Sequence, residues 1–382
     1  MATTPSFRDE LRRVLTPFES ATPLPRAAFT DPEFFELEQR TLFDNAWLPV
    51  AHVADLVRPG DWVRAPLLGE HVIILRDAGL EVSALSATCT HRGTLLVEGD
   101  DGHLETLCLT CPYHGFTYAT DGTLLAAPGM EGRQRPPGLS RLRVEIQFGV
   151  VFVNRDPEAR PFDTCWEGGP PWLSRAALWN LERSRRTDHE VNANWKVLVG
   201  NFQESHHFTR VHPGLEGKTP WSASASVIES EAWLGGTMEL ADGFETVSES
   251  GERQGRPFIA AVEDRRRVHD ALVLPLWFTS LQPDYLLTYR LAPLAVDRTL
   301  VVAEIHVHPG ALSPPVNLED LFTFWDRTNA EDRAICELQQ RGLSARRLAT
   351  SCYTESEDGL HAFERIVAAR CLAAPHEPGG IA

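Results

Sequence analysis

Two short motifs, each with one cysteine and one histidine, carry the first chemistry that the sequence offers. Cys89 and His91 form a C-x-H pair, Cys111 and His114 form a C-x-x-H pair, and 19 residues separate the two pairs. Each pair is expected at a strand-to-loop junction, so that two loop tips supply two donors each to one metal centre. Two thiolates and two imidazoles suit either a tetrahedral zinc ion or a [2Fe–2S] cluster with mixed ligands. Zinc fingers normally place a cysteine pair before a histidine pair, whereas here the two types alternate, which favours the cluster.

A second motif lies further along the chain. Glu204, His207 and His212 form the pattern E-x-x-H-x-x-x-x-H. A helix expected from Trp195 to about His207 would bring both histidines to one metal, the first from the helix end and the second from the following loop. Two imidazoles and one carboxylate with open positions form the facial triad of non-haem Fe(II) oxygenases. Without further context, a histidine pair of this kind also suits a structural role.

The residues around the two loop tips carry a family resemblance. They read C-T-H-R-G at 89–93 and C-P-Y-H-G-F at 111–116. This closely resembles the Rieske family, whose pattern is C-x-H-R-G followed by C-P-Y-H-G and an aromatic residue, usually tryptophan. Phe116 departs mildly from that pattern. The resemblance implies that the two cysteines bind one iron of a [2Fe–2S] cluster and the two histidines bind the other.

The order of the two motifs along the chain extends the resemblance beyond the Rieske segment. A Rieske motif upstream of E-x-x-H-x-x-x-x-H is the pattern of Rieske non-haem iron oxygenases, the family that includes the α subunits of aromatic-ring-hydroxylating dioxygenases. The residues N-W-K at 194–196 and V-H-P at 211–213 match the family too, and the resemblance runs from about Asp31 to Phe363. It implies that both histidines of the second motif bind a mononuclear Fe(II).

The family also needs a carboxylate ligand from the C-terminal part of the chain. The segment Trp325–Glu337 reads W-D-R-T-N-A-E-D-R-A-I-C-E. It is similar to a W-D-x-T-N-x-x-D-x-x-x-C-E segment of the betaine-type members, in which the second aspartate is the ligand. Asp332 takes that position by match. Asp326 and Glu331 are its rivals, and each would otherwise belong to a solvated acidic helix face.

Glu204 and Asn201 take further roles by resemblance. In the family, a carboxylate three residues before the first iron histidine bridges that histidine to a Rieske histidine of the neighbouring subunit. By this match, electrons would pass from His114 through Glu204 to His207, and the arrangement implies a homotrimer. Glutamate at this position is similar to the choline, carnitine and glycine betaine monooxygenases, whereas most ring-hydroxylating members have aspartate. Asn201 resembles a family asparagine near the iron, although it equally suits helix stabilisation.

The elements that must position these residues divide the chain into three parts. Residues 1–44 are expected to form a helical lead-in, in which Asp31 caps a helix. From 45 to 160, short β-type runs alternate with Gly, Pro and Asp turns, which predicts an all-β Rieske [2Fe–2S] domain. From 161 to 382, strand-like runs are flanked by helices, which predicts an α+β catalytic domain with an antiparallel sheet covered by helices. The expected fold class is therefore α+β.

Within the C-terminal part, the pattern predicts individual elements. Helices are expected at about 318–341 and 360–372, and strands at 236–240, 286–291 and 299–308. The stretch 155–190 is rich in Pro and Arg and is interpreted as the connection between the two domains.

Composition limits the class of partner. The chain has 382 residues and a formal net charge of -17, which argues against nucleic acid and anionic membranes as partners. Apolar runs such as 72–75 and 149–153 are far shorter than a membrane span. The first residues lack the apolar stretch of a signal peptide, so we expect a cytoplasmic protein. Seven cysteines without an export signal favour metal ligands and free thiols over a disulfide framework.

The source of electrons follows from a missing pattern. No G-x-G-x-x-G follows a predicted strand, so the chain is not expected to bind a dinucleotide or a flavin. The resemblance implies that electrons from NAD(P)H arrive through a separate reductase of the flavin or ferredoxin type. Molecular oxygen and a small-molecule substrate would be the other reactants.

The substrate is interpreted from Glu204 and the Trp325–Glu337 segment, together with 235–240 and 282–285, all of which look like the betaine-type group. This predicts a monooxygenase that hydroxylates an N-methyl group of a quaternary ammonium compound similar to glycine betaine. The resulting carbinolamine would lose formaldehyde, so the net reaction is N-demethylation. A quaternary ammonium needs an aromatic cage. The candidates, which equally suit core packing, are Trp233, Phe244, Trp277, Phe278 and Tyr285.

An alternative remains at this point. A ring-hydroxylating dioxygenase α subunit that acts on an aromatic compound would use the same iron ligands, and only the substrate pocket would differ. An electron carrier with a Rieske cluster alone would lack the second motif, so E-x-x-H-x-x-x-x-H argues against it.

Overall fold

The structure is a computed structural model that describes residues 6–165, 169–173, 178, 180–260, 262–345 and 351–374. The chain divides into two compact units. One comprises Phe43–Thr164, here called the β unit, and the other comprises Met1–Leu42 with Cys165–Ala382, here called the α+β unit. Among the described residues, none of the helices combines the length and the apolar character that a bilayer crossing requires.

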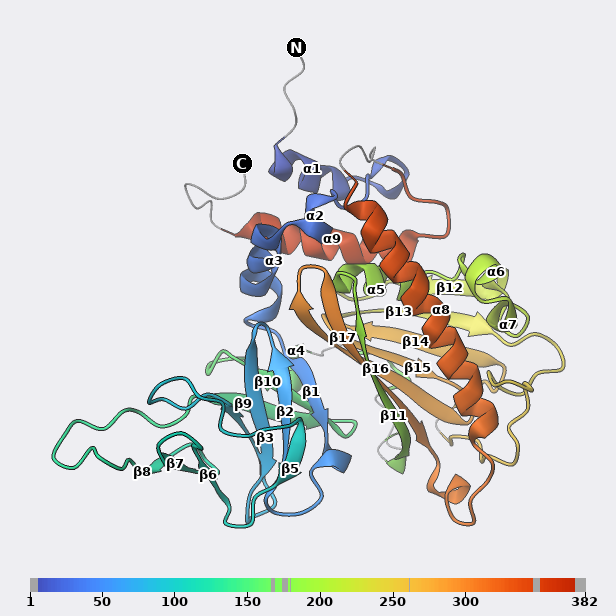
Figure 1. Ribbon diagram of the computed structural model, residues 1–382. Coiled ribbons are helices and arrows are strands. Elements are labelled where there is room, and N and C mark those ends of the chain that lie inside the picture. Colours follow the sequence, from blue (N-terminus) through green and yellow to red (C-terminus); the bar gives the residue numbers. More distant parts are fainter. Residues whose placement is uncertain are drawn as a thin grey trace. The chain divides into compact units, whose positions relative to one another are not determined.

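The β unit contains two antiparallel sheets (Figure 1). The larger sheet has the order β1-β10-β9-β4-β3-β2-β5, and the smaller has the order β6-β7-β8. The strands are β1 (Leu48–His52), β2 (Asp61–Leu67), β3 (Glu70–Arg76), β4 (Val82–Ser86), β5 (Asp101–His103), β6 (Cys108–Thr110), β7 (Thr117–Ala119), β8 (Leu124–Ala126), β9 (Arg141–Gln147) and β10 (Val150–Asn154). The all-β prediction for this part of the chain is confirmed.

Tight turns and one apolar cluster hold the β unit together. Gly149, between β9 and β10, has φ +78°, and a Cβ placed there would lie 2.5 Å from the His52 ring. Only glycine accommodates both constraints without strain. Buried side chains of both sheets, including Ile73, Leu109 and Tyr118, pack into a single core with Cys89. The cysteine-bearing loops are therefore anchored to the core of this unit.

The α+β unit is built on a seven-stranded antiparallel sheet with the order β11-β17-β16-β15-β14-β13-β12. Its strands are β11 (Glu182–Val191), β12 (Ser224–Val227), β13 (Trp233–Glu239), β14 (Arg267–Val273), β15 (Trp277–Leu281), β16 (Tyr285–Ala295) and β17 (Arg298–Val307). From β13 to β17 each strand pairs with the next one along the chain. β11 returns to the open edge of β17.

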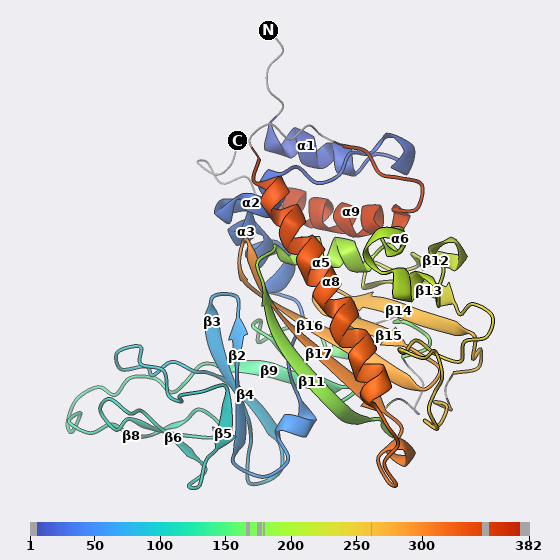
Figure 2. The same cartoon turned by 45° about the vertical axis from the view of Figure 1, so that its right-hand side comes forward.

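Helices cover this sheet. They are α1 (Phe7–Val14), α2 (Ala27–Thr30), α3 (Pro32–Glu38), α5 (Trp195–Phe202), α6 (Phe208–Val211), α7 (Pro213–Glu216), α8 (Glu319–Leu343) and α9 (Asp358–Ala373), while α4 (Phe162–Cys165) spans the sequence boundary between the two units. The long helix α8 crosses one face of the sheet in both views (Figures 1 and 2). Phe324 and Trp325 of α8 pack there against Tyr285 and Ile305 of the sheet. The predicted α+β fold class is confirmed.

The N-terminal helices belong to the α+β unit. Asp31 caps α3, since its side chain accepts a hydrogen bond from the Glu33 backbone N–H at 2.9 Å, as predicted. α1 packs on α9, and α2 contacts α8. The lead-in therefore supports the helices of the catalytic part.

Two predictions about local structure were wrong. The stretch 155–190 was interpreted as a connection, but Glu182–Val191 forms the edge strand β11. Its alternation is concealed because half-buried positions such as Arg183, Arg185 and His189 are as polar as the exposed ones, and charges suit a sheet edge. The helix expected to reach His207 ends at Phe202, and a new short helix begins at Phe208.

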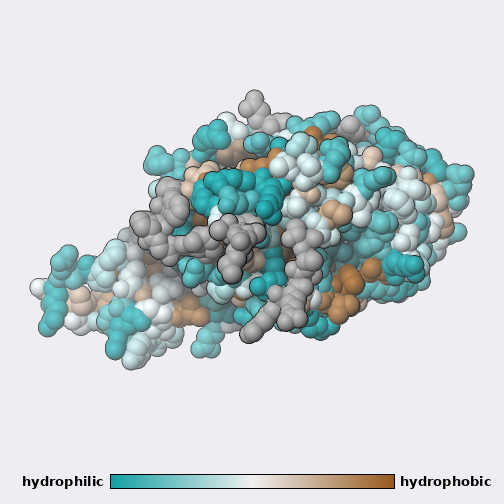
Figure 3. Space-filling view, turned by 90° about the horizontal axis from the view of Figure 1, so that it is seen from above, coloured by the Kyte–Doolittle hydropathy of each residue, from teal (hydrophilic) through white to brown (hydrophobic). Residues whose placement is uncertain are grey.

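The surface seen in Figure 3 is largely hydrophilic or intermediate in hydropathy, and hydrophobic residues appear there only in small patches. Among the described residues, the large hydrophobic side chains with the greatest exposure are scattered over several elements, namely Val57, Leu80, Leu95, Tyr113, Leu125, Ile228 and Leu338. Single exposed residues of this kind are ordinary in globular proteins.

Candidate functional site

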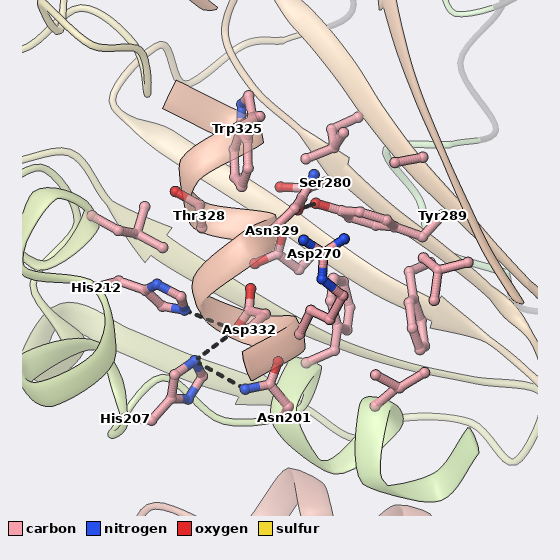
Figure 4. Close-up of a pocket in the computed structure, with 18 of the residues that line it drawn as sticks. Asn201, His207, His212, Asp270, Ser280, Tyr289, Trp325, Thr328, Asn329 and Asp332 are labelled. Atoms are coloured by element: carbon pink, nitrogen blue, oxygen red, sulfur yellow. Dashed lines mark hydrogen bonds and ion pairs between the residues drawn. The ribbon is translucent and has the colours of Figure 1, made fainter. Parts of the chain in front are cut away.

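Three side chains from two parts of the α+β unit meet at one point (Figure 4). His207 lies in the turn before α6, His212 lies between α6 and α7, and Asp332 lies on α8. Asp332 Oδ1 is 2.8 Å from His212 Nε2 and 3.7 Å from His207 Nε2. The three potential ligand atoms all lie within 4.8 Å of one another. We call these three residues the triad.

Local sequence explains why both histidines turn to the same side. Asn194 starts α5 by accepting a hydrogen bond from the Lys196 backbone N–H at 3.0 Å. α5 ends at Phe202, and after α6 Pro213 takes the first position of α7. Proline cannot continue the preceding helix, but it suits the first turn of a new one. The chain therefore changes direction at His212, which is almost fully buried.

Each histidine of the triad is oriented by a glutamate. His207 Nδ1 lies 2.7 Å from Glu204 Oε1, and the His207 backbone N–H donates to Glu204 Oε2 at 3.1 Å. His212 Nδ1 lies 2.7 Å from Glu331 Oε2. A carboxylate at Nδ1 keeps the ring proton there and leaves Nε2 free to bind a metal. Both Nε2 atoms face Asp332, so the two glutamates prepare the same kind of donor at each histidine.

The triad suits a divalent iron ion. It offers two imidazole nitrogens and one carboxylate, the donor set of non-haem Fe(II) oxygenases with open coordination positions. Burial tends to lower the pKa of His212, but the carboxylates of Asp332 and Glu331 outweigh it and raise that pKa. The field that favours a proton on this ring also favours a cation between the three side chains.

The rival carboxylates have other partners. Asp326 forms an ion pair with Arg185 in a partly exposed position, away from both histidines. Glu331 contacts His212 at the outer nitrogen rather than at the side that faces Asp332. From the sequence we considered Glu331 only as a possible metal ligand, so we did not predict that Glu331 orients His212. The spacing of adjacent acidic residues on α8 offers a hint of it, since neighbouring positions point to different sides of a helix.

Replacing Glu331 with glutamine is expected to weaken iron binding about tenfold or more, because the charged acceptor at His212 Nδ1 is lost while the triad itself is kept. The measurement is the iron content of protein equilibrated against a graded series of chelator concentrations. Asp326→Asn removes the same charge from the same helix without touching a histidine and should bind iron like the unaltered protein. Equal iron retention in both variants would contradict the role given to Glu331.

Asn201 lies at the end of α5 next to the triad. Its Nδ2 is 3.4 Å from His207 Nε2, and its side chain lines the same cavity (Figure 4). The side chain is half-buried and faces the metal position rather than the backbone of its own helix. Asn201 therefore lies beside the triad, and its role there stays a prediction.

A cavity of about 140 Å³ opens on the triad. Most of its wall is apolar or aromatic and is contributed by α5, α6, α8 and the sheet, including Phe202, Phe208, Phe278, Tyr289 and Trp325. A void of roughly 150 Å³ takes a molecule of about the size of benzene. The site therefore suits a small substrate held beside the metal position and shielded from water.

The aromatic lining differs from the set considered from sequence. Of those five candidates, only Phe278 lines the cavity. Trp233, Trp277 and Tyr285 are buried in the core. Tyr285 has a supporting role, because its hydroxyl accepts a hydrogen bond from Trp325 Nε1 at 2.8 Å and donates one to the Val247 carbonyl at 2.6 Å. The lining residues come from distant segments, so no local pattern marks them.

The two cysteine–histidine loops of the β unit share one backbone arrangement. Gly93 donates to the Cys89 carbonyl at 3.0 Å, and Gly115 donates to the Cys111 carbonyl at 3.0 Å. Both glycines have positive φ, +75° and +72°, a conformation that side chains disfavour. The glycine that follows each histidine by one or two residues therefore closes each loop tip.

The four predicted cluster residues lie together. The His91 and His114 rings are 4.8 Å apart between centroids, and the buried thiols of Cys89 and Cys111 interact with each other. Burial opposes ionisation of Cys111, but hydrogen bonds from the Tyr113 and His114 backbones and from Cys89 lower its pKa. A Cys111 thiol that favours its thiolate, a second buried cysteine beside it and two paired imidazoles are the chemistry that a mixed-ligand [2Fe–2S] cluster requires.

The surroundings of this group also fit a cluster. Phe116, which stands where relatives usually have tryptophan, stacks on His91 with centroids 4.5 Å apart and an interplanar angle of 4°. The Tyr118 hydroxyl lies 3.2 Å from Cys89 Sγ. Hydrogen bonds to ligand sulfurs tune the reduction potential of such a cluster.

Comparison with known protein families gives two matches. Residues 178–373 match the model of the ring hydroxylating alpha subunit (catalytic domain), and residues 46–142 match the Rieske [2Fe–2S] domain. The first domain binds mononuclear iron and the second a [2Fe–2S] cluster. The prediction of these two cofactors is confirmed at the level of the domains.

Two individual relatives share 31% and 24% of their aligned residues with this chain. A carnitine monooxygenase oxygenase subunit of Acinetobacter baumannii is 31% identical over 50% of this chain and 53% of that protein, so the chain spans only about half the length of this relative. A glycine betaine monooxygenase oxygenase subunit of Pseudomonas aeruginosa is 24% identical over 84% of this chain and 82% of that protein.

Solved structures share the fold. The quaternary ammonium Rieske monooxygenase CntA in complex with L-carnitine has a TM-score of 0.76 and 23% identity, covering 97% of this chain and 99% of that one. Naphthalene 1,2-dioxygenase from Rhodococcus has a TM-score of 0.76 and 17% identity, covering 96% and 98%. At these identities the likeness concerns the fold alone.

Proposed function

Since the chain belongs to the family of ring-hydroxylating alpha subunits, we propose that it is the oxygenase component of a Rieske non-haem iron monooxygenase. It uses O2 and electrons from NAD(P)H, delivered by a separate flavin or ferredoxin-type reductase. Its substrate is a small quaternary ammonium compound similar to glycine betaine, and its reaction is N-demethylation. Residues 45–160 serve as the cluster domain and 161–382 as the catalytic domain.

The observation that carries this proposal is the triad at the wall of a small, mainly apolar and aromatic cavity. Aromatic faces hold a quaternary ammonium through cation–π attraction without requiring a hydrogen bond. The relatives named carnitine and glycine betaine monooxygenase oxygenase subunits support this choice of substrate class. A dioxygenase acting on an aromatic compound is the alternative, supported only by a likeness of fold.

The residues take the following roles. Cys89, Cys111, His91 and His114 would hold the [2Fe–2S] cluster, and His207, His212 and Asp332 would hold Fe(II). When bound, the cluster stores an electron and the iron binds and reductively activates O2. Glu204 and Glu331 keep the protons of the triad histidines at Nδ1. The apolar wall excludes water and presents an N-methyl group to the triad.

The overall reaction balances as an N-demethylation. One oxygen atom of O2 enters a C–H bond of the N-methyl group, and the other leaves as water after uptake of two electrons and two protons. The resulting carbinolamine breaks its C–N bond and releases formaldehyde and a proton. The product is the corresponding tertiary amine.

The electron path requires more than one subunit in this proposal. Glu204 bridges His207 to His114 of the neighbouring subunit, and three subunits form a ring. What supports the bridge is the bond between Glu204 Oε1 and His207 Nδ1 at 2.7 Å, together with the half-buried position of the carboxylate at the turn before α6.

Replacing Glu204 with glutamine is expected to leave both metal centres filled while slowing oxidation of the cluster about tenfold to 100-fold, because the charged link between the histidines is lost. Stopped-flow absorbance of the reduced protein mixed with O2 and substrate measures this rate. Turnover driven by hydrogen peroxide bypasses electron delivery and should be kept. Unchanged cluster oxidation in the variant would refute the bridge.

A substrate panel tests the function itself. The protein, with a reductase or with hydrogen peroxide, is offered glycine betaine, choline, carnitine and stachydrine beside naphthalene and benzoate. We expect formaldehyde from at least one quaternary ammonium compound and no dihydrodiol from the aromatic compounds. Formaldehyde from none of the four, with a dihydrodiol from naphthalene or benzoate, would replace the proposal with its alternative.

A further inference from the structure

Among the described residues, the wall of the cavity beside the triad has four Asp, Glu and Arg side chains: Glu204, Asp270, Asp332 and Arg333. Two of them already have partners at the metal position. Glu204 holds His207, and Asp332 faces both histidines. Asp270 and Arg333 therefore bring one negative and one positive charge to the cavity that the triad does not use.

Asp270 stands on the sheet side of the cavity. It lies on β14, opposite Gly236 of β13 and Ser280 of β15. The Ser280 hydroxyl donates a hydrogen bond to its carboxylate. Its Oδ1 is shielded from solvent and has no hydrogen-bond partner among the described residues. Burial raises the pKa of Asp270 to about 7. The shift arises because a buried carboxylate without a cation beside it is less stable than one in water.

Arg333 stands on the helix side. It follows Asp332 on α8 and is half-buried. In the part of the chain that the structure describes, its guanidinium takes part in no ion pair, not even with Asp270. Its acidic neighbours on the helix have other partners, since Glu331 contacts His212 and Glu337 accepts from Asn192. The charge of Arg333 is thus available to a ligand.

Beyond the hydrogen bond from Ser280 to Asp270, no described side chain of the wall pairs with either charge. Most of it is apolar, and the Tyr289 hydroxyl already donates to Asn329 at 2.7 Å. A charge in such surroundings is costly unless a partner of opposite sign joins it. A ligand that brings a cation to Asp270 and an anion to Arg333 would offset both costs, whereas a neutral aromatic compound would offset neither.

We propose that Asp270 and Arg333 are specificity-determining residues that recognise the two opposite charges of a small zwitterionic substrate, an ammonium at Asp270 and a carboxylate at Arg333. This inference rests on the proposed function and narrows it from quaternary ammonium compounds in general to those that carry a carboxylate. The aromatic wall holds the apolar surface of the ammonium, and the guanidinium forms charge-assisted hydrogen bonds to the carboxylate.

Binding of three matched ligands to the full chain tests the two halves of the inference separately. Glycine betaine carries both charges, 3,3-dimethylbutanoate replaces its nitrogen with carbon and keeps only the carboxylate, and choline keeps only the cation. Isothermal titration measures their dissociation constants in the absence of O2, so no turnover is involved. The variants are Asp270→Asn, which preserves shape, and Arg333→Gln.

The expected pattern is reciprocal. Asp270→Asn should weaken glycine betaine and choline about tenfold or more and leave 3,3-dimethylbutanoate unchanged. Arg333→Gln should weaken glycine betaine and 3,3-dimethylbutanoate to a similar extent and leave choline unchanged. Asp326→Asn and Arg341→Gln change the same charges on α8 outside the cavity wall and should bind all three ligands as the unaltered protein does.

Two results overturn the inference. One is an equal loss of affinity for all three ligands, which indicates general damage to the cavity. The other is unchanged binding of glycine betaine by both variants. If formaldehyde still forms from glycine betaine in that second case, the proposed function stands and only the assignment of Asp270 and Arg333 fails. If the unaltered protein binds neither glycine betaine nor choline and releases no formaldehyde from them or from other quaternary ammonium compounds, the proposed function fails together with the inference.

Discussion

Replacing Asp332 with alanine is expected to remove the mononuclear iron and to lower turnover by more than about 100-fold, while the absorption of the cluster stays unchanged. Among the described residues, Asp332 is the one carboxylate whose oxygen lies beside both Nε2 atoms. Without it, two imidazoles remain, a weaker donor set than the facial triad. The loss should exceed the tenfold to 100-fold effect of removing an outer partner of a ligand. Iron content and cluster absorbance, measured on the same sample, check both parts.

Asp326→Ala is the matched control for this change. It removes the same side chain from the same helix, but Asp326 pairs with Arg185 rather than with a histidine. We expect this variant to keep its iron and its activity. If Asp332→Ala retained iron and turnover while Glu331→Ala lost them, the carboxylate ligand would be Glu331 and the assignment of the triad would be wrong.

Replacing Lys196 with methionine is expected to destabilise the α+β unit by about 3–5 kcal/mol, because it leaves the buried Glu38 carboxyl without its charged partner in the core. Lys196 Nζ lies 2.6 Å from Glu38 Oε1, and neither side chain is exposed. Burial raises the pKa of Glu38 and lowers that of Lys196. The pair joins α3 to α5, the helix that carries Asn201 and precedes Glu204. The midpoint of urea unfolding measures the loss.

Two further variants separate the lost pairing from a general effect of the substitution. Glu38→Gln/Lys196→Met removes both charges and keeps an acceptor for Trp195 Nε1, which now donates to Glu38 at 3.1 Å. It should be more stable than Lys196→Met alone. Arg12→Met breaks the exposed Arg12–Asp9 pair and should leave the urea midpoint close to that of the unaltered protein, because exposed ion pairs contribute little to stability. A double variant no more stable than the single one would contradict this account.

The parts of the site that local spacing encodes were predictable from sequence. C-x-H and C-x-x-H place their donors on single loop tips, and the structure brings Cys89, His91, Cys111 and His114 together. The turn through Glu204, His207 and His212 is likewise a short local motif. α8 was predictable because its apolar residues recur at helical spacing over a long segment. The sheets of the β unit were predictable because turn residues punctuate short strands.

The remaining parts depend on contacts between distant segments. β11 is charged along much of its length, and only its pairing with β17 makes it a strand. The cavity wall draws Phe202 from a helix and Tyr289 from a strand, so no local pattern identifies it. Asp270 looks like an ordinary strand residue in the sequence. Its significance comes from the absence of a partner for Oδ1 among the described residues, a property of the packed structure.

A single turnover of the pre-reduced protein tests the central claim most directly, because one sample reports both the electron and the product. Protein with its cluster reduced and all external reductant removed is mixed with O2 and glycine betaine, and cluster absorbance and formaldehyde are followed together. The account predicts that glycine betaine accelerates oxidation of the cluster and that formaldehyde forms in an amount comparable to the mononuclear iron. Acceleration by naphthalene instead, with a dihydrodiol as product and no formaldehyde from glycine betaine, would contradict it.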